Sequence, residues 1–228
     1  MTSLIDLQRA AVLTFSERGY AATGIRDIAT AAGVTSGALY MHAPSKMALL
    51  ESVMHLALDE LLRIAETVRS ASPDPATRLA GLVRAHVSVQ ARNPRTVRVV
   101  DGEVRILPAA DRPVILEKRD AYEAYWAEVL GDGIAAGDFT AEEPAVTRLA
   151  LLEMCNGVAR WYRPGGPLSL ERLQDVFVRL AFNVVGFAGA VPAADTSSHA
   201  RVLPCEPAEA NVPPVSPAAP VGRPLAGE

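Results

Sequence analysis

The feature that most constrains the fold is the helical spacing of apolar residues, which persists from residue 4 to about residue 190. The pattern begins at Leu4, Leu7, Ala11 and Phe15, and intervals of three and four residues place side chains on one face of an α-helix. The valine-rich stretch 95–107 also fits a strand locally, but its helical surroundings favour a short helix. The sequence therefore predicts an all-α protein of about nine helices.

Helix breakers divide this pattern into segments. Gly19 and Gly33 suit helix ends, Pro44 and Ser45 close one short helix and begin the next, and 71–75 and 93–94 interrupt the chain again. The segment from 45 to about 70 is long enough to serve as a strut between two domains. We predict a three-helix domain over residues 1–48 and a larger helical domain over 49–190.

Residues 191–228 have a different composition. They hold 8 of the 17 prolines, many alanines, few bulky apolar residues and no helical period. Such a segment buries too little apolar surface to offset its ordering entropy. We predict a Pro/Ala-rich disordered tail.

Composition excludes several classes of protein. Half the residues are hydrophobic and 21% are charged, as in globular proteins with a sizeable core. Cys155 and Cys205 lie far apart without clustered histidines, so we predict neither a disulfide nor a metal site, and no cofactor motif is present. No stretch reaches the roughly 18 apolar residues of a membrane span, and no leader pattern begins the chain. A cytoplasmic protein without a membrane partner is expected.

The stretch 19–50 carries the functional signal, because two short helices follow one another around a glycine turn. This is how a helix-turn-helix presents its second helix to the DNA major groove. The same spacing also fits an ordinary αα-hairpin.

The side chains of the second helix favour DNA binding. Its first turn is small and polar, which lets the backbone approach base edges, and its hydroxyls can donate or accept hydrogen bonds. Val34 and Leu39 are expected to point inward. The candidate DNA contacts are Thr23, Thr35, Ser36, Gly37, Tyr40, His42 and Lys46.

Three of these candidates have more than one interpretation. Thr35 is a good N-cap for its own helix, and Thr23 is expected to cap the preceding helix, contact phosphate, or do both. Lys46 lies in the first turn of a helix, where a cation opposes the helix dipole unless an external anion such as phosphate offsets it. An ordinary solvated lysine is the alternative.

The net charge of −4 limits the electrostatic contribution to DNA binding. Residues 1–50 hold four cations and three carboxylates, so the predicted DNA-binding segment is close to neutral. Specific binding would then depend on dimerisation, backbone amides and few phosphate contacts.

Residues 10–50 resemble the DNA-binding domain of the TetR family of transcriptional regulators. The resemblance rests on GIRDIATAAGV, then SGALYMH, then SKMALL. This chain departs from the family pattern at Ala43, where phenylalanine often stands, and at Gly24, where Ser, Thr or Val is usual. The resemblance implies a helix-turn-helix head, a helical dimerisation and ligand domain, and operator DNA as partner.

The C-terminal part resembles one branch of that family. RWYRPGGPLSLERL at 160–173 and EKRDAYEAYWAEVLGDGIAAGDF at 117–139 are similar to the cholesterol-catabolism repressors, which respond to coenzyme A thioesters of steroid ring fragments, and more loosely to fatty acyl-CoA regulators. The resemblance covers most of 10–187, and the tail has no counterpart. It implies a small hydrophobic effector, with an acyl-CoA thioester as one candidate. Asn156 stands where the steroid-ester repressors tend to carry an aromatic residue, which puts steroid specificity in doubt.

The residues suggest where such an effector would bind. Arginines can pair with phosphates and aromatic side chains can line an apolar cavity, while Asn156 can hydrogen-bond a ligand or a backbone across a dimer. Charged residues on helix faces are more often solvated, and the aromatics at 161–162 fit a dimer seam as well as a pocket. The candidate ligand residues are Glu103, Arg119, Tyr122, Trp126, Asn156, Arg160 and Arg163.

The last two expected helices, at about 144–162 and 169–190, are apolar enough to require a partner surface. We expect them to form a four-helix interface between two copies of the chain. The candidate interface residues are Trp161, Leu173, Phe177, Leu180 and Val184.

Two other classes of protein compete with a regulator. An enzyme is disfavoured because the four histidines are scattered and no nucleophile, phosphate-binding loop or metal-spaced pair occurs. A helical scaffold that binds protein would expose an apolar face on the helix after Gly33, whereas Ser36, Gly37 and Tyr40 stand there. The sequence therefore favours a ligand-responsive DNA-binding regulator, with the scaffold as the alternative.

Overall fold

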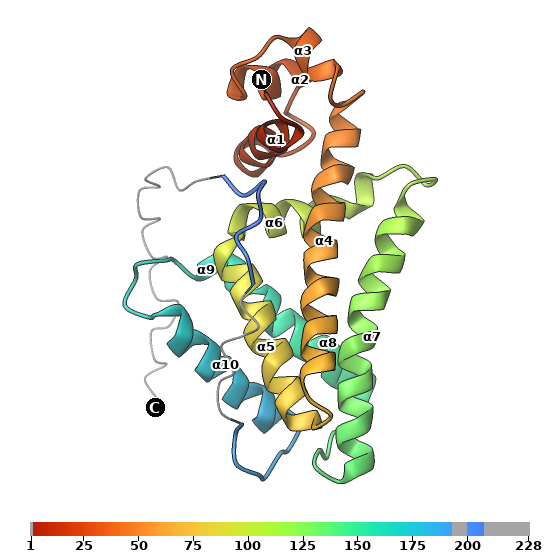
Figure 1. The fold of residues 1–228 in the computed structure, drawn as a ribbon, viewed down its shortest axis with the longest axis vertical. Coiled ribbons are helices and arrows are strands. Elements are labelled where there is room, and N and C mark those ends of the chain that lie inside the picture. Colours follow the sequence, from red (N-terminus) through yellow and green to blue (C-terminus); the bar gives the residue numbers. More distant parts are fainter. Residues whose placement is uncertain (1, 193–199, 208–228) are drawn as a thin grey trace, which may run out of the picture.

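The computed structural model describes residues 2–192 and 200–207, and every regular element in them is helical (Figure 1). Ten α-helices and one 3₁₀ helix occur in these residues, in agreement with the predicted all-α class. They are α1 (Leu4–Arg18), α2 (Ile25–Ala31), α3 (Ser36–Tyr40), α4 (Lys46–Ala71), α5 (Pro75–Arg92), α6 (Pro94–Glu103), η1 (Val104–Ile106), α7 (Arg112–Ala136), α8 (Pro144–Asn156), α9 (Val158–Trp161) and α10 (Leu170–Val184).

The helix boundaries follow the local chemistry of the sequence. Ser3 caps α1 in a reciprocal capping box with Asp6, and Ser45 accepts a hydrogen bond from the Ala48 N–H at 3.0 Å to begin α4. Asp74 caps α5, whose first residue is a proline. At Gly137, which ends α7, the left-handed φ of +79° favours glycine.

Three segments differ from the sequence prediction. The helix expected over 144–162 is divided at Gly157 into α8 and α9, and the last helix ends at Val184, before the expected 190. The valine-rich stretch 95–107 is helical, as favoured, but changes from α6 to a 3₁₀ turn at Val104.

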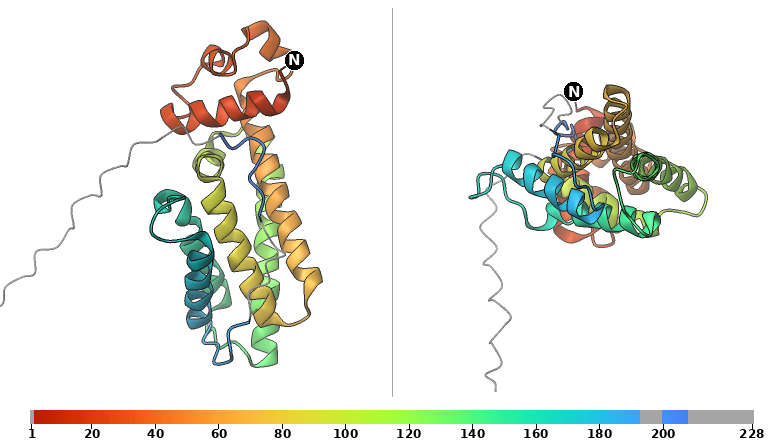
Figure 2. Two further views of the ribbon diagram at one scale, coloured as in Figure 1. Left: turned by 60° about the vertical axis from the view of Figure 1, so that its left-hand side comes forward. Right: turned by 90° about the horizontal axis from the view of Figure 1, so that it is seen from below.

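The helices form a small head on a larger body. Figures 1 and 2 show α1–α3 at one end, with α4 running from this head along the body formed by α5, α7, α8 and α10. Ser45 to Ser72 bound one unbroken helix. The long helix predicted as a strut therefore connects the two parts of the molecule.

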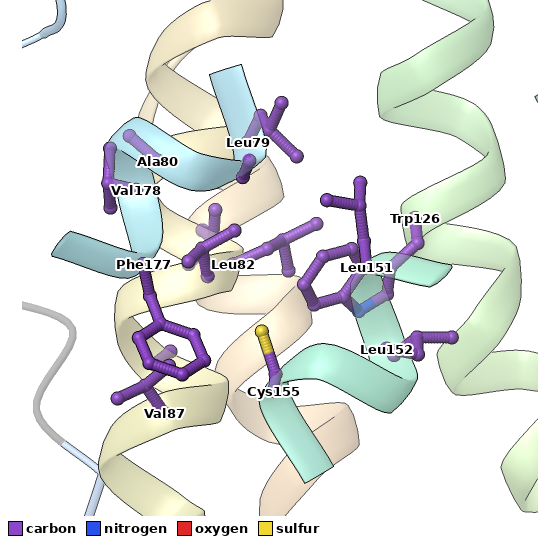
Figure 3. Packing of buried hydrophobic residues seen from close by; sticks show 14 of the residues in the cluster. Leu79, Ala80, Leu82, Val87, Trp126, Leu151, Leu152, Cys155, Phe177 and Val178 are labelled. Carbon is purple, nitrogen blue, oxygen red and sulfur yellow. The ribbon is translucent and has the colours of Figure 1, made fainter. Parts of the chain in front are cut away.

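Two hydrophobic clusters match these two parts. The larger one packs α4, α5, α7, α8 and α10 around Trp126, and Figure 3 shows Phe177 and Val178 of α10 reaching toward α5. The smaller one packs α1–α3 against α4 and continues into α6 and α7 through Val99, Val100 and Ile115. The head is thus fixed to the body by shared apolar packing.

The predicted disorder of 191–228 is wrong for residues 200–207, and the stretches 193–199 and 208–228 lie outside the described residues. Leu203 and Cys205 are buried in the cluster of the head, and Ala200 is buried in that of the body. Composition did not predict this order, because a few buried apolar residues and hydrogen bonds to a preformed surface are enough to hold a short segment in place. We call residues 200–207 the C-terminal strap (Figure 2, left).

Candidate functional site

The segment 25–40 forms the predicted helix-turn-helix. Helix α2 buries Ile28 and Ala29, and the turn to α3 passes through Gly33, whose φ is +68°. The Val34 N–H donates to the Ala29 carbonyl at 2.9 Å, and Leu39 is fully buried. Buried Leu39 and half-buried Val34 therefore fix the angle at which α3 is presented, as predicted.

The outer face of α3 is open to solvent. Thr35 is exposed and is the N-cap of α3, accepting a hydrogen bond from the Ala38 N–H at 3.2 Å. Gly37, Tyr40 and His42 are exposed as well, and Ser36 is half-buried. This is the geometry expected of a helix that reads the edges of base pairs.

Sequence reasoning missed one residue on this surface. Met41 is 86% exposed, the highest value among the large apolar side chains of the described residues. Met41 lies two residues after the inward-pointing Leu39, and on a helix that spacing turns a side chain to the opposite face. This spacing could have identified Met41 as exposed.

The roles expected for Thr23 are wrong. Its side chain is 1% exposed, and its hydroxyl donates to the carbonyls of Gly19 at 2.8 Å and Thr14 at 3.3 Å. The N-cap of α2 is Gly24, whose N–H donates to the Asp27 carboxylate at 2.7 Å. Thr23 therefore closes the end of α1 and is too buried to contact phosphate through its hydroxyl.

Lys46 is held by the head itself. Its ammonium donates to the carbonyls of Tyr20 at 2.7 Å and Thr23 at 2.6 Å, and lies 4.0 Å from the centre of the Tyr20 ring. The solvated lysine of the alternative interpretation is thus excluded. An ammonium has three donors, so one proton remains available to an anion.

The cations of the head are mostly engaged by internal partners. Arg9 contacts Asp6, Arg18 lies 3.4 Å from Asp27, and Lys46 binds backbone carbonyls. Arg26 is exposed and has no ion pair among the described residues. The head is therefore near neutral, and pairing further reduces the number of its cations that are free to contact phosphate.

A cavity of about 140 Å³ lies in the body between α4, α5, α6, α7 and α8. A cavity of about this size can hold a benzene-sized group. Its walls combine apolar side chains with a polar cluster and several carboxylates. The lining residues are Ala57, Leu58, Leu61, His86, Val89, Gln90, Val97, Val100, Asp101, Arg119, Tyr122, Glu123, Leu149, Leu152, Glu153 and Asn156.

The polar cluster is centred on His86. Burial lowers the pKa of His86 to about 4, so its ring is neutral near pH 7. His86 Nε2 lies 2.8 Å from the Asn156 side-chain oxygen and 3.2 Å from Gln90 Nε2, and Nδ1 lies 2.8 Å from the Tyr122 hydroxyl. In the tautomer that donates to Asn156, Nε2 carries the proton and Nδ1 accepts from Tyr122. Gln90 Nε2 also donates to the Asn156 oxygen at 3.2 Å.

Three of the predicted ligand residues, Arg119, Tyr122 and Asn156, line this cavity together. Arg119 donates to the Asp101 carboxylate at 3.0 Å, yet burial still raises the pKa of Asp101. Asn156 binds His86 and Gln90 of its own chain, so the expected contact across a dimer is not what holds it. Sequence reasoning missed His86 and Gln90, although their spacing of four on an apolar helix was a usable signal.

Four other candidates lie outside the cavity wall. Glu103 accepts a hydrogen bond from the Tyr20 N–H of the head at 3.4 Å. The residues of α6 that line the cavity are Val97, Val100 and Asp101. Trp126 is fully buried behind the wall, with its ring 5.9 Å from His86 and 6.4 Å from Tyr122. Arg160 and Arg163 are exposed.

The candidate dimer residues divide into two groups. Leu173 and Phe177 are buried within the chain, 1% and 6% exposed, because α5 covers them and Trp161 stacks on Phe177. Their assignment to a dimer seam is therefore wrong. Trp161, Leu180 and Val184 are about half exposed and remain open to a partner.

The described residues contain no helix long and apolar enough to cross a bilayer. Within the same residues, no three His, Cys, Asp or Glu side chains gather in a way that could hold a metal ion.

The exposed reading helix, joined by one long helix to a body with a polar cavity, defines a helix-turn-helix regulator with a ligand-sensing domain. Residues 7–53 match the model of bacterial regulatory proteins of the tetR family, and residues 72–185 match that of the tetracyclin repressor-like C-terminal domain. The chain belongs to the TetR family and is a DNA-binding transcriptional regulator. The family resemblance drawn from the sequence is confirmed.

Relatives and solved structures agree with this family. The transcriptional repressor KstR2 of Rhodococcus jostii is 31% identical over 185 residues, covering 80% of this chain and 89% of the relative. The structure of the ketosteroid regulator KstR2 of Mycobacterium tuberculosis has a TM-score of 0.75 at 27% identity, covering 83% and 97% of the two chains. AibR, solved with isovaleryl coenzyme A and operator DNA, shares the fold at a TM-score of 0.70 and 23% identity, covering 76% and 95%.

Proposed function

We propose that the chain is a homodimeric cytoplasmic repressor that binds operator DNA through α3 and leaves it when a small effector occupies the cavity of the body. One observation carries this proposal. Helix α4 supplies Leu49 and Leu50 to the core of the head and Ala57, Leu58 and Leu61 to the cavity wall. A ligand in the cavity therefore contacts the same rigid helix that positions the reading head.

DNA would be read by the exposed face of α3. Thr35, Ser36 and Gly37, in the first turn of α3, would approach base edges, and the exposed Tyr40 and His42 would reach the rim of the groove. Lys46, with one proton not used by the Tyr20 and Thr23 carbonyls, would bind a phosphate.

Dimerisation would use α8 and α10. These helices leave apolar side chains exposed, namely Val146 and Leu149 on α8 and Leu180 and Val184 on α10. A four-helix interface with a second copy would cover them. Leu180→Glu together with Val184→Glu should give a folded monomer by light scattering at micromolar concentration, and a persistent dimer would contradict this interface.

The effector class is inferred from the cavity and the relatives together. A cavity of about 140 Å³ accommodates a short acyl group and is too small for a whole coenzyme. Burial raises the pKa of Asp101 on the cavity wall, and Arg160 is close enough to oppose this rise. Burial lowers the pKa of Arg98, and Arg163 is close enough to lower it further. We infer that the acyl part of a CoA thioester enters the cavity while Arg98, Arg160 and Arg163 bind coenzyme phosphates outside.

Release of DNA would follow from a differential affinity. Two reading heads must lie about one helical turn of DNA apart, so a tilt of α4 in both copies misaligns them. The effector shifts this equilibrium only if it binds the misaligned state more tightly, by a few kcal/mol.

The test is an electrophoretic shift with the promoter DNA beside the protein's own gene. We expect sequence-specific, salt-sensitive binding that short-chain acyl-CoA thioesters reverse and free coenzyme A does not. Thermal stabilisation by free acids but never by their thioesters would overturn the coenzyme assignment. Failure to bind any tested operator, while the dimer is intact, would favour the helical scaffold.

A variant separates the phosphate contacts from DNA binding. Arg160→Ala with Arg163→Ala should raise the thioester concentration needed for release by about tenfold or more, since each charge-assisted hydrogen bond contributes roughly 1.5–3 kcal/mol. Arg105→Ala, an exposed arginine away from the cavity wall, is the matched control and should have no effect. Equal effects of the two variants would contradict the assignment.

A further inference from the structure

The cavity contains an acceptor that has no donor. Gln90 is 3% exposed and lines the cavity, and its Oε1 has no hydrogen-bond partner among the described residues. Leaving a buried polar atom unpaired costs roughly 1–3 kcal/mol. Such an atom on a cavity wall indicates what the cavity is built to bind.

The neighbouring groups cannot supply the missing proton. The Nε2 proton of His86 is directed to Asn156, the Tyr122 hydroxyl donates to His86, and the Gln90 amide group donates to Asn156. The protons of His86, Tyr122 and Gln90 are therefore used within the cluster, and the Asn156 amide makes no hydrogen bond to Gln90 Oε1 among the described residues. Gln90 Oε1 thus presents an unpaired acceptor to a ligand in the cavity.

The rest of the cavity also favours donors. Glu153 is a carboxylate with no ion pair among the described residues, while Glu123 is paired with Arg148 at 3.2 Å. Arg119 is the cation of the wall; its Nη2 donates to Asp101 and to the Val100 carbonyl, while its Nε has no acceptor among the described residues. Gln90 Oε1 and Glu153 thus offer acceptors to a ligand donor in a benzene-sized space, and Arg119 Nε offers one donor.

We propose that the effector carries a hydroxyl or amide N–H that donates to Gln90 Oε1, which rests on the proposed function of the cavity. For a CoA thioester this means a hydroxyacyl group, because saturated and keto acyl groups offer no proton. A site built to hydrogen-bond a ligand hydroxyl discriminates strongly against the analogue that lacks it.

The experiment uses thermal shift on the full chain without DNA. Cyclopentanol and cyclopentanone have nearly the same size, and only the alcohol donates. We expect the alcohol to give the larger rise in Tm, and we expect Gln90→Met to abolish the difference. Gln8→Met is the matched control, because Gln8 is also a buried glutamine with an unpaired Oε1 but lies in the head, outside the cavity, and it should keep the difference. A ketone that stabilises equally, no stabilisation by the alcohol, or a preference that survives in Gln90→Met would overturn the proposal.

The same rule can be tested on thioesters with DNA present. 3-Hydroxybutyryl-CoA should release DNA at a lower concentration than butyryl-CoA or acetoacetyl-CoA. Alcohol binding without any release of DNA by thioesters would contradict the proposed function and leave the donor rule intact. Release by all three thioesters at the same concentration would contradict the donor rule and leave the proposed function intact.

A different observation concerns the C-terminal strap and the start of α6. Asn93 occupies the N-cap position of α6 but makes no capping hydrogen bond. The Glu206 carboxylate accepts instead from the backbone N–H groups of Arg95 at 3.1 Å and Thr96 at 2.9 Å, and from the Thr96 hydroxyl at 2.6 Å. The strap thus caps α6 from more than one hundred residues away along the chain.

The side chain of Asn93 is used to hold the strap. Its oxygen accepts from the Leu203 N–H at 2.6 Å, and its amide donates to the Arg201 carbonyl at 3.2 Å. Asn93, at the N-cap position, therefore binds the strap, and Glu206 of the strap accepts the hydrogen bonds that an N-cap side chain would normally accept.

The other side of the strap is attached to the head. Arg9 of α1 donates to the Pro204 carbonyl at 2.8 Å, and Leu203 and Cys205 are buried in the same cluster as Leu7. Helix α6 in turn supplies Val97 and Asp101 to the cavity wall. The strap therefore contacts both the reading head and a helix that lines the effector cavity.

We infer that the C-terminal strap couples α6 to α1, so that movement of the cavity wall is transmitted to the reading head through residues 200–207 as well as through α4. A preordered head also binds DNA at a lower ordering cost. Loosening the contact of the strap with α6 should then destabilise α1, and loosening its contact with α1 should destabilise the start of α6.

Reciprocal hydrogen exchange on the full chain tests this coupling. Glu206→Ala should reduce amide protection in α1 as well as at Arg95 and Thr96, and Arg9→Ala should reduce protection at Arg95 and Thr96. Glu142→Ala, an exposed carboxylate in the loop before α8, is the control and should change neither. Effects confined to the mutated side would mean that Glu206 is only a local cap, and would overturn the proposal.

Operator affinity gives a second readout. Both variants should weaken binding to the promoter fragment several-fold, and the double variant should be no weaker than the weaker single one, because one strap is broken in each case. Additive losses of affinity would indicate two independent effects and contradict a coupling strap.

Discussion

The head and the body stabilise their buried polar residues in different ways. In the head, Thr14 and Thr23 donate to backbone carbonyls no more than nine residues away. In the body, Arg84 reaches Asp175 of α10 and His86 reaches Tyr122 of α7 and Asn156 of α8. The buried threonines of the head thus depend on local bonds, with Gln8 of α1 making a longer connection to Ser52 of α4 at 3.0 Å, whereas bonds between helices hold the buried polar side chains of the body.

The largest expected effect concerns the packing that supports the polar cluster of the body. Trp126→Ala should lower the free energy of unfolding by about 3–5 kcal/mol, because a fully buried tryptophan leaves a large cavity. Urea denaturation measures this loss. Because the head and the body share apolar packing through Val99, Val100 and Ile115, α1 should lose amide protection at the same urea concentrations as α7 and α8. Protection of α1 that persists to higher urea concentrations would show that the local bonds of the head hold it independently.

The second prediction uses the pH dependence of the body. The pKa of His86 is lowered to about 4 by burial, below the 6.5 of an exposed histidine, so the unfolded chain binds more protons between these values. This contribution to stability is full above pH 6.5 and is lost as pH falls toward 4, by on the order of 3 kcal/mol. His86→Gln should flatten the pH profile of Tm in this window. An unchanged slope would show that His86 is charged or exposed in the folded protein.

Much of this organisation was predictable from the sequence, because it depends on local signals. Gly33, Thr35 and Leu39 have the conformation, the capping bond and the burial that their residue types indicated. The cavity and the strap were not predictable, since they depend on pairs such as His86 with Asn156 and Thr96 with Glu206, which helical periodicity does not relate. The division of α10 into buried Phe177 and exposed Leu180 likewise depends on tertiary packing, since Phe177 packs in the cluster of the body and contacts Trp161 while Leu180 is 42% exposed.

The third prediction separates stability from reading at the recognition helix. Thr35→Ala removes the N-cap of α3 and should cost about 1 kcal/mol of stability, and it should also weaken operator binding by about fivefold to tenfold. Asp74→Ala is the matched control, because it removes the same kind of cap from α5, far from α3 in Figure 1. It should cost a similar stability and leave DNA binding unchanged. Equal operator affinity of the two variants would contradict a direct role of Thr35 in DNA binding.

The smallest effect on stability is expected at Arg26, which tests whether the head binds DNA with few phosphate contacts. Arg26 is exposed and without an ion pair among the described residues, so Arg26→Ala should change stability by less than about 0.5 kcal/mol. The slope of log K against log salt should fall by about 1 for each DNA phosphate that the variant no longer neutralises. Arg18→Ala should change this slope less, because Asp27 lies 3.4 Å from the Arg18 guanidinium. If both variants lower the slope equally, internal pairing does not limit the cations of the head, and specificity would depend on charge more than the exposed face of α3 indicates.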